Sequence, residues 1–419
     1  MMRIGIIGMG YVGLSTAVVL ADQGNEMVCV DVDMKKLEML KRGKPPIYEK
    51  GMEEMLNRNL NRMTMTADYK DLADADILFI CVPTPTKDGR CDTSYVKAAA
   101  KAINDANLKG IPVIKSTMPP TAIEDVSKVL GKMPVMNPEF LKEGTALEDT
   151  IRPDRVVIGA DNIKDFEKLK EIWSFTNAPI IMASPAEASI IKYASNSFLA
   201  TKVSFINEIA DLCERIPNCD VGVIAKGMGM DRRIGDKFLN AGPGYGGSCF
   251  PKDTEELRNL ARNIGRPMNI VDAAVSTNCR RSVEMVNKLK KLMGSIRGKR
   301  IGVLGIAFKA NTDDTRESVS IKIMEELVKE GAIVVAYDPK AKATIEGIDQ
   351  VNMKEECIRD SEGIIIATEW EEFRGLENAL EGKYVLDTRR ILNPELMDPR
   401  YFSTIGRGKE TSKKAKTTY

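Results

Sequence analysis

The stretch RIGIIGMGYVG, at residues 3–13, carries the strongest fold signal in the sequence. An apolar run, Arg3–Ile7, leads directly into glycines at positions 8, 10 and 13 and then into a helical pattern. Gly8 permits a tight turn, Gly10 lets a ligand approach the backbone, and Gly13 lets helix and strand pack closely. Because a helix N-terminus attracts phosphate, this stretch predicts the first strand–turn–helix unit of a nucleotide-binding sheet.

An acidic residue at the end of the second predicted strand strengthens this prediction. Asp31 lies 23 positions after Gly8, about where a carboxylate binds the hydroxyls of an adenosine ribose. A carboxylate there repels a 2′-phosphate, so NAD is favoured over NADP, although the nearby Lys36 weakens the preference slightly. The alternative is a glycine turn that binds nothing, and the combination of strand, turn, helix and acid argues against it.

Short runs rich in Val and Ile recur in the first and last thirds of the chain, separated by helical patterns. They are Arg3–Ile7, Met27–Val30, Ile77–Val82, Pro112–Lys115 and Val156–Gly159, then Arg300–Gly305, Ile333–Tyr337, Ile364–Ala367 and Tyr384–Asp387. Such runs are typical of strands buried on both faces of a parallel sheet. A capping box at Ser184–Glu187 begins a long helical pattern, and a second one runs from Asp253 to about Met293, interrupted near residues 265–267.

We therefore predict an α/β fold with two Rossmann-like, doubly wound parallel sheets joined by a long central helix and a helical section. The predicted parts are a cofactor-binding domain at 1–183, a helical and dimerisation region at 184–296, a second Rossmann-like domain at 297–405 and a basic, disordered tail at 406–419.

Composition excludes several kinds of function. The 419 residues carry a net charge of +1 and no histidine, so neither a nucleic-acid partner nor a histidine-based triad or metal site is predicted. The eight cysteines form no CxxC motif and show no metal-ligand spacing, which suggests a reducing, cytoplasmic environment. No apolar run approaches the ~20 residues of a membrane span.

The stretch GPGYGGSCFPKD, at residues 242–253, is the most informative one for chemistry. Its glycines let the backbone approach a ligand, and Cys249 precedes a helix predicted to begin near Asp253. A helix N-terminus and the neighbouring Lys252 both favour a thiolate, so Cys249 is a candidate nucleophile. Lys192 and Asn196 are four residues apart on the long helix and would stabilise an oxyanion there, unless they are only a solvated helix face.

The second sheet carries a weaker nucleotide signal. Its run Gly302–Lys309 lacks the third glycine at the expected spacing, so a full dinucleotide site is doubtful, whereas a site for one nucleotide is plausible. Lys309 and Arg316 would hold phosphate, or they are ordinary loop charges. In the first sheet, Glu139 and Glu143, and the segment Lys115–Thr117, follow strand-like runs, where doubly wound sheets place their ligands.

Together these motifs resemble the UDP-glucose/GDP-mannose dehydrogenase family over residues 1 to about 400. The segments that carry the resemblance are Gly8–Leu14, Pro46–Glu49, Val82–Pro85, Lys115–Thr117, Asn137–Ala146, Lys192–Asn196, Asp231–Gly235, Gly244–Asp253 and Phe308–Ser318. The resemblance implies that two NAD oxidise the C6 alcohol of a nucleotide sugar to a carboxylate, while Cys249 carries a thiohemiacetal and then a thioester. It also implies a homodimer or higher homo-oligomer that pairs through the long helix.

The resemblance assigns roles residue by residue. Lys192 and Asn196 would stabilise the oxyanion, Asp253 and Thr117 would organise the hydrolytic water, and Glu143 would lie near that water. The implied cofactor contacts are Gly8, Gly10, Val12, Gly13, Asp31, Lys36, Thr84, Thr117, Glu143, Lys252 and Arg316. The implied substrate contacts are Glu139, Phe140, Leu141, Lys142, Glu143, Lys192, Asn196, Phe238, Leu239, Asn240, Ala241, Gly242, Gly246, Lys309 and, from the partner subunit of the dimer, Arg233.

The resemblance favours UDP-glucose as the sugar and UDP-glucuronate as the product, and three alternatives remain open at this point. The first is the same chemistry on GDP-mannose, UDP-N-acetylmannosamine or UDP-N-acetylglucosamine, although the run Asn137–Gly144 resembles the glucose branch of the family more than the N-acetyl branch. The second is a two-electron 3-hydroxyacid dehydrogenase, which has no use for Cys249 or for a second sheet. The third is an inactive NAD or nucleotide-sugar sensor, against which the intact candidate catalytic set argues.

Overall fold

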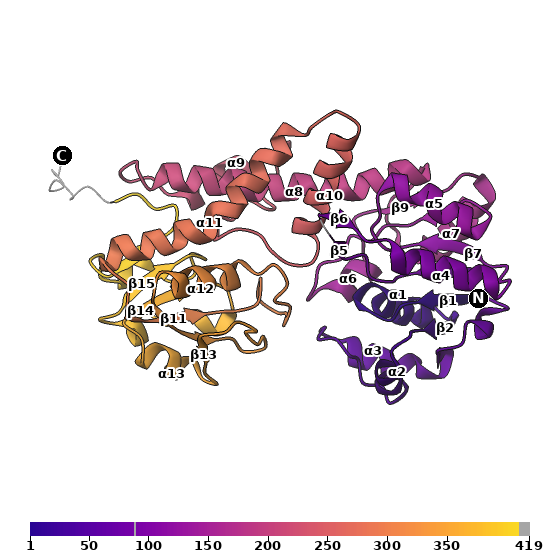
Figure 1. The fold of residues 1–419 in the computed structure, drawn as a ribbon, viewed down its shortest axis with the longest axis horizontal. Helices are drawn as coiled ribbons and strands as arrows, with labels where there is room; N and C mark the ends of the chain where they lie inside the picture. The colour runs from indigo at the N-terminus through magenta and orange to yellow at the C-terminus, as the bar shows by residue number, and fades with distance from the viewer. Residues whose placement is uncertain (88, 410–419) are drawn as a thin grey trace. The chain divides into compact units, whose positions relative to one another are not determined.

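The computed structural model describes residues 1–87 and 89–409 (Figure 1). The described chain forms two compact units. Unit 1 comprises Met1–Ser195 and Glu255–Ile264, and unit 2 comprises Asn196–Thr254 and the chain from Gly265 onward. The domain boundaries expected at 183/184 and 296/297 stay a prediction.

Unit 1 contains an eight-stranded sheet in the order β10-β9-β8-β7-β4-β1-β2-β3. Neighbouring strands are parallel except for β8 and β9, which are antiparallel. The strands are β1 Arg3–Ile7, β2 Glu26–Val30, β3 Met63–Thr66, β4 Ile77–Ile80, β7 Ile111–Ile114, β8 Val135–Met136, β9 Val156–Gly159 and β10 Ile180–Ala183. A separate two-stranded hairpin pairs β5 Thr86–Lys87 with β6 Arg90–Cys91.

Helices cover both faces of this sheet, because its strands are apolar on both sides. In β1, Ile4 and Ile6 belong to the core shared with α1 and α3, whereas Ile7 belongs to the core shared with α4 and α5. This alternation is the two-residue period of a strand. The helices are α1 Tyr11–Asp22, α2 Met34–Lys41, α3 Met52–Asn59, α4 Ser94–Asp105, α5 Pro120–Leu130, α6 Ala146–Ile151 and α7 Ile163–Trp173.

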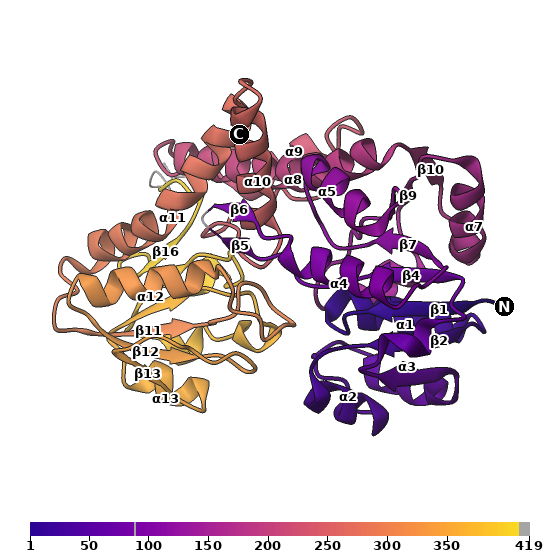
Figure 2. The ribbon, with the colours of Figure 1, turned by 45° about the vertical axis from the view of Figure 1, so that its right-hand side comes forward.

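Unit 2 contains a six-stranded, fully parallel sheet in the order β13-β12-β11-β14-β15-β16. The strands are β11 Arg300–Leu304, β12 Ile333–Tyr337, β13 Ile348–Gln350, β14 Gly363–Ile366, β15 Tyr384–Asp387 and β16 Phe402–Thr404. Helices α11 (Asn269–Met293) and α12 (Val319–Lys329) lie over one face, and α13 (Lys354–Arg359) lies over the other (Figure 2). Two parallel sheets covered by helices confirm the predicted fold class.

The helical section comprises α8 Pro185–Cys213, α9 Val221–Gly229, α10 Phe250–Asn263 and the already named α11. The capping box forms as predicted: the Ser184 N–H donates to Glu187 at 2.8 Å, and the Glu187 N–H donates to the Ser184 hydroxyl at 3.2 Å. The expected interruption near residues 265–267 falls between α10 and α11. Helix α10 begins three residues earlier than predicted, since Pro251 is well tolerated in a first turn.

The start of the predicted tail is part of unit 2. Gly406 accepts the N–H of Val221 at 2.9 Å, Gly408 donates to Cys219 at 2.8 Å, and Lys409 accepts the N–H of Asn218 at 3.2 Å. Residues 406–409 are therefore fixed by backbone hydrogen bonds that the polar composition does not reveal. The rest of the predicted tail, 410–419, lies outside the described residues. Within the described chain, every helix is too short or too polar to cross a membrane.

Candidate active site

The turn between β1 and α1 contains two glycines that packing requires and a third that faces open space. Gly8 has a left-handed φ of +95°, and a Cβ there would lie 2.8 Å from the Cys81 carbonyl oxygen. A Cβ on Gly13 would collide with the Gly8 carbonyl, so both glycines are needed for packing. A Cβ on Gly10 would meet nothing within 4 Å, and Gly10 directly precedes α1. This open space at a helix N-terminus fits the pyrophosphate of a dinucleotide.

Asp31 lies directly after β2 and is 7% exposed. Its carboxylate accepts the N–H groups of Met9 at 2.7 Å and Asp33 at 2.9 Å, and the Lys36 ammonium lies 2.9 Å away. Burial raises the pKa of Asp31, but these hydrogen bonds and Lys36 outweigh burial, so the pKa lies below its ordinary value. The structure thus brings an ionised acid to the same sheet edge as Gly10, as ribose binding requires.

Two predicted threonines follow the neighbouring strands. Thr84 comes after β4 and Thr117 after β7, and β7, β4 and β1 are successive parallel strands. The Ser116 hydroxyl donates to the Val82 carbonyl at 2.7 Å, which ties the two strand ends together. Both threonines therefore lie at the sheet edge that carries the glycine turn.

A buried ion pair joins the loop after β8 to helix α8. The Lys192 ammonium lies 2.8 Å from Glu139, and the two side chains are only 3% and 7% exposed. Glu139 also accepts the N–H of Leu141 at 2.6 Å. Burial raises the pKa of Glu139, but Lys192, the Leu141 N–H and the Lys115 ammonium together outweigh burial, so the pKa lies below its ordinary value. This pairing keeps both groups charged and fixes the direction of Lys192.

A cavity of about 100 Å³ adjoins this ion pair in unit 1. Lys115, Glu139 and the ring of Phe140 line it, and the Arg155 guanidinium lies 3.7 Å from the centre of that ring. Burial lowers the pKa of Lys115 to about 8. The cavity is therefore lined by charged groups as well as by an aromatic ring.

A second buried carboxylate lies at the start of α10. Asp253 accepts a hydrogen bond from the Asn196 amide at 2.6 Å and one from the Lys252 ammonium at 2.6 Å. Asp253 is completely buried and Asn196 is 7% exposed. Lys192 and Asn196 were predicted to act as a pair; the structure shows that each is held by its own carboxylate, Glu139 for the first and Asp253 for the second.

Cys249 immediately precedes α10, and its carbonyl accepts the N–H of Asp253 at 2.8 Å. Its thiol is half-buried and lies 3.6 Å from the Ser248 hydroxyl. The N-terminal end of a helix favours a thiolate at this position. Burial instead raises the pKa of several other thiols, as expected for cysteines that serve packing; these are Cys29, Cys81, Cys213 and Cys357.

The loop 238–248 ahead of Cys249 contains most of the other candidate substrate residues. Phe238 has a left-handed φ of +64°, and its ring lies 5.9 Å from that of Phe250. Leu239, Ala241 and Gly242 are buried, whereas Asn240 is exposed. Most of this loop is thus held by its surroundings, and Asn240 is free to reach a ligand.

Three predicted cationic residues of unit 2 contact neighbouring residues of their own loops. Arg316 forms a bidentate ion pair with Asp314 at 2.6–3.0 Å, and its carbonyl accepts the N–H of Gly247 at 3.0 Å. The Lys309 ammonium lies 5.5 Å from the ring of Phe308. Arg233 is exposed and pairs with Asp231 of its own loop at 2.7 Å. The loop with Lys309 and Arg316 therefore contacts the glycine-rich loop before Cys249, whereas Arg233 points to solvent in the isolated chain.

Sequence reasoning missed the function of Glu49 and Tyr11. Glu49 is 7% exposed and accepts the Tyr11 hydroxyl at 2.8 Å and the N–H groups of Gly144 and Ala146 at 2.9 Å each. It thus connects the first residue of α1 to the loop that carries Glu143. The segment Pro46–Glu49 matched the family pattern, which was the available signal. No partner was assigned to Glu49, because its contacts are 38, 95 and 97 residues away in the sequence.

Comparison with known proteins places the whole chain in one class of enzyme. Three family models match in order: the NAD binding domain at residues 2–177, the central domain at 186–280 and the UDP binding domain at 302–394 of the UDP-glucose/GDP-mannose dehydrogenase family. The chain belongs to this family. The resemblance found in the sequence is therefore confirmed, and so is its assignment as an NAD-dependent oxidoreductase.

Individual relatives share most of their length with the chain. The UDP-glucose 6-dehydrogenase of Rhizobium meliloti (strain 1021) is 41% identical, covering 97% of this chain and 100% of the relative. The UDP-glucose 6-dehydrogenase TuaD of Bacillus subtilis (strain 168) is 40% identical, covering 97% and 94%. A solved UDP-glucose dehydrogenase from Pyrobaculum islandicum superposes with a TM-score of 0.88 at 37% identity, covering 95% of this chain and 98% of that one.

Proposed function

We propose that the protein oxidises the C6 alcohol of UDP-glucose to the carboxylate of UDP-glucuronate, with NAD as the hydride acceptor. Family membership supports a nucleotide sugar, and full-length relatives at 40–41% identity that are named for UDP-glucose support this particular sugar. The observation that carries the proposal is the half-buried Cys249 at the start of α10, four residues before the buried pair of Asp253 with Asn196. A two-electron dehydrogenase has no need of this arrangement.

The overall reaction consumes one UDP-glucose, two NAD⁺ and one water, and it yields UDP-glucuronate, two NADH and three protons. NAD, when bound, accepts a hydride in each of the two oxidation steps. The open space at Gly10 and the acid at Asp31 are the features of unit 1 that fit the pyrophosphate and the adenosine ribose.

Cys249 keeps the half-oxidised sugar on the enzyme. Its thiolate adds to the C6 aldehyde, forming a C–S bond and a thiohemiacetal, and the second oxidation converts this to a thioester. Water then attacks the acyl carbon, the C–S bond breaks, and the thiolate is regenerated with the carboxylate product. Because the intermediate is covalent, the aldehyde does not escape between the two steps.

Lys192 and Asn196 stabilise the negative charge that develops on the C6 oxygen. The Lys192 ammonium donates to Glu139 at 2.8 Å and brings a positive charge to the site. Its charge is maintained in a buried site by that carboxylate, which also fixes its direction. Asn196 is oriented by Asp253 in the same way, so both donors are held in place before the substrate arrives.

Asp253 and Thr117 organise the water that hydrolyses the thioester, and Glu143 lies near the same water. Each Asp253 oxygen already accepts one hydrogen bond, from Asn196 or from Lys252, and retains a lone pair for water. A buried aspartate with two fixed donors is rigid, which suits a positioning role.

The remaining candidate residues bind the two ligands. For the cofactor they are Gly8, Gly10, Val12, Gly13, Asp31, Lys36, Thr84, Thr117, Glu143, Lys252 and Arg316. For the nucleotide sugar they are Glu139, Phe140, Leu141, Lys142, Glu143, Lys192, Asn196, Phe238, Leu239, Asn240, Ala241, Gly242, Gly246 and Lys309.

The functional form is a homodimer or a higher homo-oligomer, and Arg233 acts on the site of the partner subunit. In unit 2, Phe198, Phe205 and Leu212 follow one another at seven-residue spacing on α8 and are 66%, 47% and 54% exposed. Such a stripe supports helix-to-helix association between copies. Cytoplasmic residence is proposed as well, because the eight cysteines are all free thiols.

The NADH yield per molecule of product tests the reaction. Purified protein is incubated with UDP-glucose and NAD, with NADH measured at 340 nm and the product measured by mass spectrometry. We expect two NADH per UDP-glucuronate; a steady ratio of one, or an aldehyde product, would contradict the proposal. GDP-mannose, UDP-N-acetylmannosamine and UDP-N-acetylglucosamine are assayed in parallel, and higher kcat/KM with any of them would reassign the sugar. Absence of turnover with every sugar would favour a sensor.

Replacing the nucleophile tests the covalent step. Cys249→Ser is expected to lower kcat by about 10³-fold or more and to leave a bound intermediate, because a serine hydroxyl is a far weaker nucleophile than a thiolate. Cys279→Ser, which changes an exposed cysteine of α11, is the matched control and should turn over normally. Normal turnover of the Cys249 variant would make that thiol a structural residue.

A further inference from the structure

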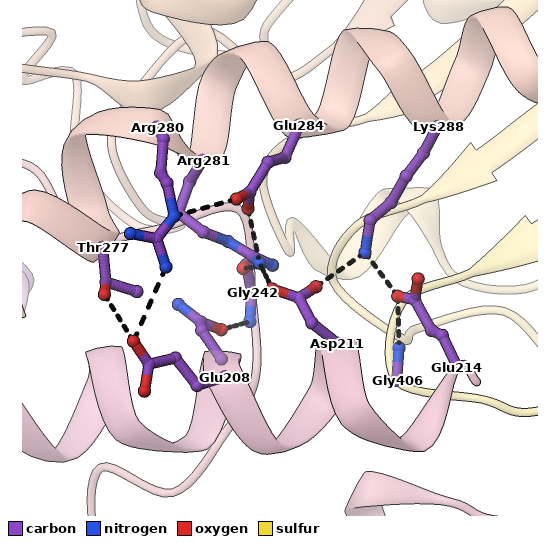
Figure 3. Close-up of polar contacts among 11 residues, drawn as sticks. Glu208, Asp211, Glu214, Gly242, Thr277, Arg280, Arg281, Glu284, Lys288 and Gly406 are labelled. Carbon is purple, nitrogen blue, oxygen red and sulfur yellow. Dashed lines mark hydrogen bonds and ion pairs between the residues drawn. The ribbon is translucent and has the colours of Figure 1, made fainter. Parts of the chain in front are cut away.

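Helix α11 contains a fully buried arginine that the proposed mechanism does not use. The Arg281 side chain is 0% exposed and is among the largest completely buried side chains of the described chain. A buried guanidinium is costly unless carboxylates and hydrogen-bond acceptors surround it. Its position therefore calls for a specific set of partners, and Figure 3 shows them.

The Arg281 guanidinium contacts one carbonyl and two carboxylates. Its Nη2 donates to the Gly242 carbonyl at 3.0 Å, and its Nη1 donates to Asp211 on α8 at 2.8 Å and to Glu284 on α11 at 3.0 Å (Figure 3). Lys288 lies 2.9 Å from the other oxygen of Asp211. The two carboxylates thus balance the guanidinium charge. Because one lies on α8 and the other on α11, two helices fix the guanidinium that donates to the Gly242 carbonyl.

Side chains of α8 and α11 form three further hydrogen bonds with the backbone of the same loop. The Gly242 N–H donates to Asn207 on α8 at 2.8 Å. The Tyr245 N–H donates to Asn278 on α11 at 2.8 Å, and the Asn278 amide donates back to the Tyr245 carbonyl at 2.9 Å. Asn278 and Arg281 are three residues apart and share one face of α11. Two helices therefore fix both peptide groups of Gly242 and the backbone of Tyr245.

A loop built this way depends on outside support. Residues 242, 244, 246 and 247 are glycines, which have no side chains of their own to anchor the backbone. A hydrogen bond from a charged donor is roughly twice as strong as a neutral one. Arg281 supplies such a charged donor to the segment Phe238–Gly242, through the Gly242 carbonyl.

We propose that Arg281 is a positioning residue for substrate binding: its bond to Gly242 sets the place of the loop 238–248 and hence of the sugar relative to Cys249. The proposal rests on the proposed function, in which Phe238–Gly242 contact the nucleotide sugar. Arg281 touches no substrate itself and acts through the backbone of this loop. Asp211 and Glu284 act one step further out, by fixing the direction of the guanidinium.

Steady-state kinetics with matched variants test this role. Arg281→Lys keeps the charge but loses the planar fork, so it cannot hold the carbonyl and both carboxylates together. Arg281→Met removes the charge as well. We expect the KM for UDP-glucose to rise about tenfold or more in Arg281→Met and less in Arg281→Lys, as for the loss of a charged hydrogen bond. NAD affinity, measured by fluorescence titration, should change less than twofold.

Arg280→Gln is the control, because Arg280 is the adjacent residue and also contacts Glu284, at 3.1 Å, but makes no bond to the loop. It should behave as wild type. If Arg281→Lys and Arg281→Met lower the melting temperature yet keep the wild-type KM for UDP-glucose, Arg281 is merely structural and the proposal is wrong.

A second readout needs no substrate and separates this proposal from the proposed function. The rate of Cys249 alkylation by iodoacetamide is followed by peptide mass spectrometry in wild type and in Arg281→Lys, which retains the positive charge. We expect the rate to change at least threefold while that of Cys91, in unit 1, stays constant; a smaller change at Cys249 would overturn the proposal. If wild type proves inactive on every nucleotide sugar, this experiment still decides whether Arg281 positions the loop.

Discussion

The two parallel sheets begin with the same local arrangement, yet only the first one builds a dinucleotide site. Gly8 after β1 and Gly305 after β11 both have a left-handed φ, +95° and +104°. The N–H of each donates to the last carbonyl of the neighbouring strand, β2 or β12, at 2.8 Å in both cases. An aspartate follows that strand in each sheet, Asp31 in the first and Asp338 in the second.

The two aspartates differ in how many hydrogen bonds their carboxylates accept from the protein. One Asp338 oxygen accepts the N–H groups of Ile306 at 2.7 Å and Ala307 at 3.0 Å and the indole N–H of Trp370 at 3.1 Å. The other oxygen accepts two backbone N–H groups of the following turn, at 2.9 and 2.8 Å. Asp31 accepts hydrogen bonds from two backbone N–H groups and from the Lys36 ammonium, and we propose that a ribose hydroxyl replaces the last of these. Asp338 is therefore a structural residue.

The helices that follow also differ. Helix α1 starts at Tyr11, directly after the open space at Gly10, so its N-terminus is available to phosphate. Helix α12 starts only at Val319, and residues 306–318 come between it and Gly305. Both sheets thus share a strand, a glycine with positive φ and an aspartate. What fits a dinucleotide in the first sheet alone is the helix N-terminus next to the glycine, together with an aspartate whose lysine partner a ligand can replace.

The largest expected effect comes from removing the structural acid of the second sheet. Asp338→Ala leaves four buried donors and one part-buried donor without their acceptor, so we expect the free energy of unfolding to fall by about 3–5 kcal/mol. The measurement is urea unfolding in a Trp173→Phe background, where Trp370 is the only tryptophan left. Asp349→Ala, at a side chain that is 65% exposed, is the control. Weaker NAD binding with unchanged stability would break the comparison.

The next effect concerns the two glycine turns. Gly10→Ala puts a methyl group where nothing lies within 4 Å, so the free protein should keep its stability while NAD binds about 100-fold more weakly, or ~2.7 kcal/mol. Gly305→Ala should do the reverse, because its Cβ would collide with Thr368 at a positive φ. Calorimetric titration with NAD and thermal melting decide the matter. Equal NAD affinity in wild type and Gly10→Ala would remove the pyrophosphate from this turn.

A smaller effect is expected from the exchangeable acid. Asp31→Asn removes the charge that we propose binds the ribose hydroxyls, so NAD should bind about tenfold more weakly, or ~1.4 kcal/mol, and the preference over NADP should shrink. Asp33→Asn is the control, since Asp33 caps α2 on the neighbouring turn. The measurement is KM for NAD and for NADP in both variants. An unchanged ratio of the two would show that Asp31, like Asp338, is structural.

The sequence predicted the central strands and the glycine turn because these signals are local. A motif such as Gly8–Gly13 needs only its own spacing, and β1, β4 and β11 are continuous apolar runs. The strands toward the edges of the sheets, such as β3, β10, β13 and β16, were not predicted. They are only three or four residues long and partly exposed, so their apolar pattern is weak.

The partners of charged side chains were beyond prediction for a different reason. Lys192 and Asn196 share a helix face, as their spacing indicates, but their carboxylates come from 53 and 57 residues away. Arg281 is seven residues after Ala274 and four before Met285, which is the spacing of the buried face of α11, but an arginine there does not reveal which carboxylates it meets. Spacing shows which residues share a face, whereas the tertiary fold decides what that face meets.

The smallest expected effect compares buried charges at the strand ends of the two sheets. Burial lowers the pKa of Lys115, after β7, to about 8 and raises the pKa of Asp387, at the end of β15. Between pH 8 and 10.5 the unfolded Lys115 binds more protons than the folded one, so its contribution to stability rises with pH. For Asp387 the folded state binds more protons, so its contribution is present below pH ~4 and is lost as pH rises.

Lys115→Met should therefore remove the increase in the free energy of unfolding between pH 8 and 10.5, an effect on the order of 1 kcal/mol given the high effective dielectric of real sites. Asp387→Asn should leave this rise between pH 8 and 10.5 unchanged. It should instead reduce the fall in the free energy of unfolding as the pH increases above 4. Urea unfolding across pH 4–10.5 measures both, with Lys128→Met, at a 76% exposed side chain, as control. An alkaline slope that survives in Lys115→Met would mean that the cavity beside Lys115 hydrates the ammonium fully, so that the first sheet carries no buried charge at this strand end.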